Sequence, residues 1–304
     1  KHNLARAYIG GGRHQDAIEI YEKLWEKFPT EHRFGVKLIE CRLALEQYQE
    51  ARQTMTRLME RKATHVQKSR EELTELNEEL KKVEPDDSTE EQRHKLRKLK
   101  RAVGTNLKTV IFLEAKILRG ENELDLALER LQSLEGIGAH HRAEVFQQQG
   151  EIYLQLSNWP AAENAFDKAW EVDPHSAAAY HGLCRSYLPQ RKNRLAAEAA
   201  QRSLSLMFFN PRCHLHYAIA LQRCRQHEMA IRALENEIKQ NPNFPAAHRR
   251  LAMILRNRFK DSDGADFHEQ QARFAAERIE EAMRERENGS SKKPEILEYS
   301  HQDI

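Results

Sequence analysis

The chain has 304 residues, of which 39% are hydrophobic, 7% aromatic and 32% charged, with 12 glycines and 9 prolines. This composition excludes a β-sandwich, a collagen-like chain and a Gly/Ser linker, each of which needs a different supply of residues. Lys and Arg number 49, Asp and Glu 47, and the net charge is +2. No global field therefore directs the chain to nucleic acid or to an anionic membrane, and we expect a mostly helical protein that recognises charge through local patches.

Signals for the membrane and for secretion are weak in this sequence. No apolar run approaches the roughly 20 residues that span a bilayer, and the first residues do not resemble a signal peptide. The four cysteines follow no CxxC spacing, which favours reduced thiols. We therefore expect a cytoplasmic protein that makes no membrane contact.

A repeat of about 34 residues runs along the chain, and a repeat of this length predicts a helical solenoid. Its best copy is FQQQGEIYLQLSNWPAAENAFDKAWEVDP. Here the small residues Gly150 and Ala162 allow two antiparallel helices to approach closely, and Tyr153 and Phe166 fill the space beside them. Pro174 then ends the second helix. In spacing and residue type this unit resembles the tetratricopeptide repeat, and the resemblance implies an all-α, right-handed solenoid.

The same pattern predicts seven units and a division of the chain. Two units, the first without its opening residues, occupy residues 1–60, and five more with a C-terminal capping helix occupy residues 108–286. The polar residues 287–304 are expected to form a flexible tail. In the fifth unit, the turn PQRKNR has about three residues more than a 34-residue period allows.

Residues 61–107 interrupt the period between the second and third units. Their valines and leucines recur three, four and seven residues apart, which is the seam spacing of a coiled coil. After a proline–aspartate turn, Ser88 and Glu91 form a capping box that starts a second helix. We predict an antiparallel helical hairpin with arms at about 48–84 and 88–119. A charged, partly disordered insert is the alternative.

The sequence carries no motif that indicates catalysis. G-x-S-x-G, G-x-x-x-x-G-K-[ST], G-x-G-x-x-G and HExxH are all absent from it. Cys213, His214 and His216 form the best candidate cluster for a metal. Helical positions two apart point to different sides, however, so we expect packing at this cluster. The sequence therefore predicts no catalytic residue, no metal and no cofactor.

In tetratricopeptide arrays the first helix of each pair lines a concave groove, so the resemblance implies that the outward residues of these helices contact a ligand. The fourth unit offers Glu144, Gln147, Gln148 and Glu151, whereas the last three units offer no acidic residue at such positions. A basic groove favours an acidic or phosphorylated extended segment of a protein, because arginine forks pair with carboxylates and phosphates. Alternatively, these arginines only keep the array in solution. The predicted binding residues are His181, Arg185, His216, Arg223, Arg249, Arg250, Met253 and Arg256.

Two other functions remain open. The basic run RHKLRKLKR at residues 93–101 makes nucleic-acid binding an alternative hypothesis, because clustered cations bind phosphates. It has no aromatic residue for stacking, and glutamates of the first hairpin arm are available to pair with it, which favours intramolecular pairing. The long insert and the stretch from Met207 to Ala252 also resemble the C-terminal repeat region of bacterial proteins whose N-terminal part is an alkaline-phosphatase-superfamily phosphodiesterase. That resemblance implies an accessory region whose partner is a catalytic domain upstream of Lys1.

Overall fold

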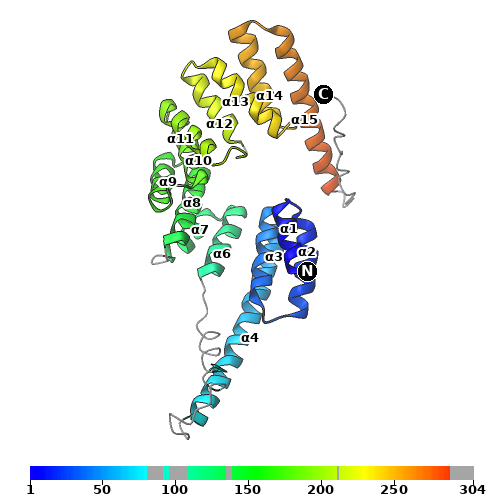
Figure 1. Cartoon of the computed structure of the whole chain (residues 1–304), viewed down its shortest axis with the longest axis vertical. Helices are drawn as coiled ribbons and strands as arrows, with labels where there is room; N and C mark the ends of the chain where they lie inside the picture. The colour runs from blue at the N-terminus through cyan, green and yellow to red at the C-terminus, as the bar shows by residue number, and fades with distance from the viewer. Residues whose placement is uncertain (81–91, 93, 96–107, 135–138, 211, 288–304) are drawn as a thin grey trace. The chain divides into compact units, whose positions relative to one another are not determined.

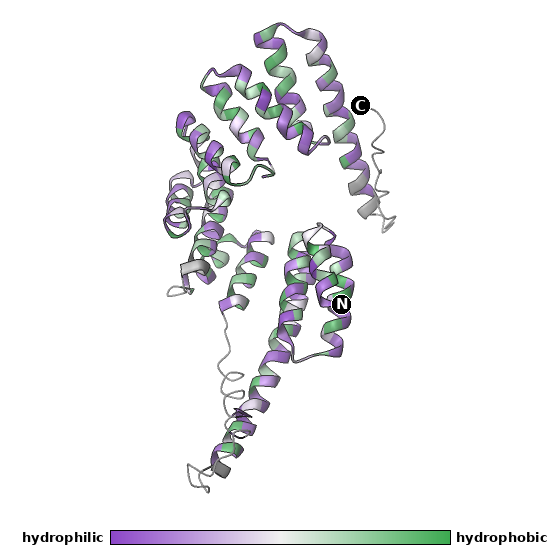
Figure 2. Cartoon of the chain, viewed as in Figure 1, coloured by the Kyte–Doolittle hydropathy of each residue, from purple (hydrophilic) through white to green (hydrophobic). Residues whose placement is uncertain are grey.

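The computed structural model describes residues 1–80, 92, 94–95, 108–134, 139–210 and 212–287. Within these ranges every regular element is a helix, as predicted, and short turns join most neighbouring helices (Figure 1). The chain divides into two compact units, unit 1 at Lys1–Asn158 and unit 2 at Trp159–Ile304. Figure 2 shows apolar and hydrophilic residues mixed along the same helices, the amphipathic pattern by which each helix buries one side against its neighbours.

Unit 1 is built on helices that pack on their neighbours in the chain. Tyr21, Trp25 and Phe34 fill the main core, and they are joined there by Val110 and Leu113 from beyond the insert. Its helices are α1 (His2–Gly10), α2 (His14–Lys27), α3 (His32–Ala44), α4 (Tyr48–Leu80), α6 (Lys108–Gly120), α7 (Leu124–Gln132) and α8 (Ala139–Gln155).

Unit 2 continues the same arrangement, and each helix again packs on the next. Close approach depends on small residues: a methyl group at Gly182 would lie 2.2 Å from the ring of Phe166. Its elements are α9 (Trp159–Val172), α10 (Ala177–Tyr187), α11 (Asn193–Leu206), α12 (Cys213–Arg223), α13 (His227–Gln240), α14 (Pro245–Ile254), the π-helical turn η1 (Leu255–Phe259) and α15 (Ser262–Glu287).

In the described chain, one residue in the left-handed conformation marks the turn before alternate helices. Each of these residues lies two positions before the start of α2, α4, α7, α9, α11, α13 or α15, and successive ones are 34 or 35 residues apart except across the insert. This spacing confirms the predicted all-α repeat. The seven residues are Gly12, Glu46, Asn122, Ser157, Arg191, Arg225 and Lys260.

The prediction of extra residues in the turn PQRKNR is wrong. Arg191, inside this turn, keeps the regular spacing to the equivalent residues on both sides. The longer connection is the one from Leu206 to Cys213, between α11 and α12, and it leaves Phe208 and Phe209 half or more exposed. The prediction measured the repeat from proline to proline, whereas the left-handed residues Ser157, Arg191 and Arg225 keep a spacing of 34 residues.

The first arm of the predicted hairpin coincides with α4, a continuous helix that extends well past α3 (Figure 1). Ala51, Met55 and Leu58 of its first turns join the core of unit 1. The hairpin turn, most of the second arm and residues 288–304 of the predicted tail lie outside the described residues. So does the basic run apart from His94 and Lys95. Within the described ranges, no helix has both the length and the apolar character that a bilayer span requires.

Candidate functional site

The residues predicted to bind a partner all lie in unit 2, on α10, α12, α14 and η1. The first helices α10 and α12 contact each other directly, in addition to packing on α11. We call the set of eight the arginine face. It consists of His181, Arg185, His216, Arg223, Arg249, Arg250, Met253 and Arg256.

A histidine pair joins α10 to α12 within the arginine face. His181 Nε2 and His216 Nδ1 lie 2.9 Å apart, so one imidazole donates a hydrogen bond to the other. Burial, together with the nearby charge of Arg185, lowers the pKa of His181 to about 3 and that of His216 to about 4. The pair is therefore neutral at neutral pH and links the two helices without adding charge.

Two arginines of this face are held in place by neutral acceptors. Arg223 Nη1 donates to the carbonyl oxygen of Leu188 at 2.5 Å, and Arg250 Nη1 donates to Gln222 Oε1 at 3.1 Å. Burial and the charge of Arg223 lower the pKa of Arg250. Among the residues that the structure describes, no carboxylate pairs with either guanidinium. Two close cations without a counter-ion favour the binding of an anion.

A cavity of about 430 Å³ opens beside Arg223. Leu188 and Pro189 give it an apolar part, and Arg191 and Asn193 add polar groups from the turn between α10 and α11. The cavity can therefore accept a side chain with an apolar stem and a negatively charged end. Sequence reasoning did not single out Arg191 or Asn193, although the run of cations in PQRKNR was a visible signal.

Arg256 departs from the pattern of the other arginines. It lies in η1, and its guanidinium pairs with Asp266 and Glu269 of α15. The first helices of the last three units carry no acidic residue on this face, but α15 supplies two from outside that set. Arg249 and Met253 are exposed, as expected for residues that contact a ligand. The cations of the face that have no carboxylate partner are thus centred on α12 and α14.

The acidic residues predicted on the fourth unit lie on α8, in unit 1. Glu151 pairs with Arg119 of α6 at 3.9 Å. Burial lowers the pKa of Lys116, also on α6, and the charge of Glu144 opposes this effect. The acidic side chains of α8 therefore face cations of α6 and are partly neutralised within unit 1.

The side chains of the candidate metal cluster, Cys213, His214 and His216, are engaged in packing and hydrogen bonds. No three His, Cys, Asp or Glu side chains gather as metal ligands in the described part of the chain. His214 hydrogen-bonds through Nε2 to the carbonyl oxygen of Phe208 at 3.1 Å, away from the partner of His216. Burial raises the pKa of Cys213 to about 11 and raises that of Cys184 as well, so both thiols stay protonated at neutral pH.

Residues 3–71 match the family model of the tetratricopeptide repeat. No curated protein matches the chain. A MamA from Desulfovibrio magneticus RS-1, residue 41 to the end, is 18% identical with a TM-score of 0.50, and the match covers 57% of this chain and 97% of that one. A MamA RS-1 double mutant is 17% identical with a TM-score of 0.50, covering 58% and 97%. At these identities the likeness shows the fold alone.

Proposed function

We propose that this chain, which carries tetratricopeptide repeats, is a protein-interaction scaffold that binds an extended acidic segment of a partner on the arginine face of unit 2. The observation that carries the proposal is the pair Arg223 and Arg250, two neighbouring cations without a carboxylate partner among the described residues. Two neighbouring cations with no carboxylate beside them repel each other, and an acidic ligand removes this repulsion.

The arginine face is preorganised for such a ligand. The His181–His216 hydrogen bond and the bond from Arg223 to Leu188 fix α10 relative to α12, and the bond from Arg250 to Gln222 links α14 to the same helix. A partner segment therefore bears most of the ordering cost, and its carboxylates gain charge-assisted hydrogen bonds from the arginine forks. The cavity beside Arg223 fixes the register by accepting one side chain.

The test is affinity capture from native lysate with three forms of the chain. The first is wild type, and the second is Arg223→Glu/Arg250→Glu. The third, Arg202→Glu/Arg232→Glu, makes the same charge change at exposed positions of the second helices α11 and α13. We expect that some proteins captured by the wild-type chain are also captured by the control variant but not by the arginine-face variant. Equal retention by both variants, or equal loss, would refute the assignment of the face.

The resemblance to repeat regions that accompany phosphodiesterase domains supports a second candidate function. In that case the chain is an accessory region, and the arginine face contacts a catalytic domain of the same polypeptide. The reading frame upstream of Lys1 decides this point. A phosphodiesterase domain there supports the accessory role, and a frame that begins just before Lys1 contradicts it.

A further inference from the structure

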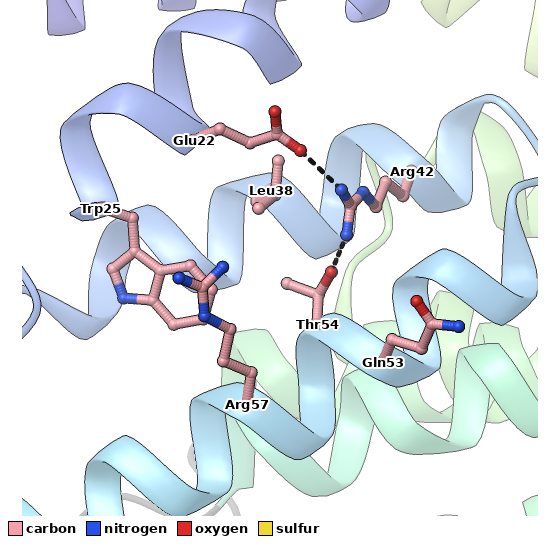
Figure 3. A pocket seen from close by; sticks show the side chains of 7 residues that line it. All are labelled: Glu22, Trp25, Leu38, Arg42, Gln53, Thr54 and Arg57. Atoms are coloured by element: carbon pink, nitrogen blue, oxygen red, sulfur yellow. Dashed lines mark hydrogen bonds and ion pairs between the residues drawn. The ribbon is translucent and has the colours of Figure 1, made fainter.

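We propose that unit 1 carries a separate oxyanion-binding site, in a cavity of about 220 Å³ formed by α2, α3 and α4. We call it the Trp25 pocket. Figure 3 shows the guanidinium of Arg57 lying across Trp25, and Arg42 reaching between Glu22 and Thr54 on the other side. The ligand is a single phosphate or carboxylate group, either free or carried on a polypeptide side chain.

Arg57, which lines the Trp25 pocket, and Arg61, one helical turn further along α4, both contact the ring of Trp25. The guanidinium carbons of Arg57 and Arg61 lie 5.1 and 4.3 Å from the ring centre of Trp25, which is only 1% exposed. Burial lowers the pKa of Arg61, and the charge of Arg57 lowers it further. The buried indole thus holds two like charges together on its surface through cation–π contacts.

These two arginines differ in what remains free to bind. Arg61 Nη1 donates to the carbonyl oxygen of Trp25 at 3.1 Å. The side chain of Arg57 makes no hydrogen bond or ion pair with any residue that the structure describes. Its planar fork of N–H donors lines the cavity and matches the geometry of a carboxylate or a phosphate.

The opposite wall of the pocket is rigid and nearly neutral. Arg42 Nη2 donates to Glu22 Oε1 at 2.7 Å, and Nη1 donates to the carbonyl oxygen of Glu50 at 3.0 Å and to the hydroxyl of Thr54. Glu22 therefore balances Arg42 and keeps it in place, while Arg57 supplies the surplus charge. A frame that is already ordered loses little entropy when an anion binds.

The size of the pocket limits the ligand to one small group. Cofactor and drug-sized sites usually occupy about 300 to 1,000 Å³, and this cavity is smaller. A cation is disfavoured by the charge of Arg57, and a purely apolar group would cover Gln53 and Arg57 without giving either a hydrogen-bond partner. An oxyanion on a short stem meets both conditions.

The test uses Trp25 as its own reporter. Trp159 and Trp170, the other two tryptophans, both lie in unit 2, so the variant Trp159→Phe/Trp170→Phe leaves the pocket intact. We expect inorganic phosphate, titrated at constant ionic strength, to change the emission of Trp25 saturably. Calorimetry on the same samples measures binding without relying on the indole.

Two variants of α4 make the test specific. Arg57→Gln should weaken phosphate binding by about tenfold or more, because it removes the free fork. Arg70→Gln removes the same charge from an exposed position further along the helix and should leave the affinity unchanged. Circular dichroism checks that both variants are folded. Parallel titrations with a phosphoserine peptide, its unphosphorylated form and a glutamate peptide identify whether a polypeptide supplies the oxyanion. The proposal fails if none of the three oxyanion probes (phosphate, the phosphoserine peptide and the glutamate peptide) binds saturably, or if Arg57→Gln and Arg70→Gln titrate alike.

Discussion

Unit 1 and unit 2 are built from the same kind of antiparallel helices, but different side-chain interactions connect their neighbouring first helices. In unit 1, Arg119 of α6 pairs with Glu151 of α8. In unit 2, α10 and α12 are connected by two histidines and by Arg223 on a backbone carbonyl. The repeat pattern therefore specifies how helices pack, and leaves open whether cations are neutralised internally or left for a ligand.

The largest expected effect comes from reversing the uncompensated charges of unit 2. Arg223→Glu/Arg250→Glu should weaken binding of a purified acidic partner segment by about thirtyfold or more, since lost and newly repulsive charge contacts together cost about 2 to 5 kcal/mol. Calorimetric titration at about 0.15 M salt measures this. The control Arg202→Glu/Arg232→Glu should stay within about twofold of wild type. If the two variants lose affinity equally, general charge and not the arginine face governs binding.

The neutral histidine link should make unit 2 sensitive to acid. Because the pKa values of His181 and His216 lie below the unfolded value of about 6.5, the unfolded chain takes up protons first as the pH falls. The stabilisation is complete above about pH 6.5 and is lost toward pH 4, at up to about 1.4 kcal/mol per histidine and pH unit.

Urea unfolding at a series of pH values tests this acid sensitivity. The double variant His181→Gln/His216→Gln keeps polar side chains at both positions but has no group that titrates there. Its free energy of unfolding should fall less steeply than that of wild type below about pH 6.5. Equal slopes for the two proteins would show that the histidine pair does not contribute.

A smaller change should convert unit 2 to the chemistry of unit 1. Gln222→Glu gives Arg250 a carboxylate at the position of its present amide partner. The charge-assisted bond should raise the free energy of unfolding by about 1 kcal/mol. It should also lower the affinity for the acidic partner segment by about tenfold, because the internal carboxylate competes with the ligand for Arg250. Thermal unfolding and calorimetry measure the two effects. Higher stability with unchanged affinity would exclude Arg250 from the binding site.

The smallest effect is expected from the reverse change in unit 1. Glu151→Gln leaves Arg119 without its partner, but both side chains are nearly a third exposed and 3.9 Å apart. The free energy of unfolding should fall by about 0.5 kcal/mol or less, and binding of the acidic segment to unit 2 should not change. A loss of binding would show that α8 belongs to the ligand site.

The fold was predictable because helix packing restricts residue type at a fixed period. Ala162 and Phe166, which the sequence assigns to a helix contact, are both fully buried. The sequence analysis placed the extra residues in the turn PQRKNR, whereas the longer connection lies between α11 and α12. The error arose because the prolines do not keep a fixed position within the repeat. The period alone does not reveal this shift; the left-handed residues Ser157, Arg191 and Arg225 do.

The candidate sites were predictable only in part. First-helix positions selected Arg223 and Arg250 as candidates, and the structure places Arg223 at the surface and leaves Arg250 partly buried. The carboxylate partners of Arg256 come from α15, and the Trp25 pocket depends on Arg42 reaching Glu22, which lies 20 residues earlier in the chain. Such contacts are set by side-chain reach between separate elements, for which the sequence has no period.

The most direct test of the arginine face is hydrogen–deuterium exchange of the whole chain with and without a captured acidic segment. Slower exchange on binding should be concentrated in the first helices α10, α12 and α14 of unit 2. Protection confined to the second helices α11 and α13, or to unit 1, would contradict the account.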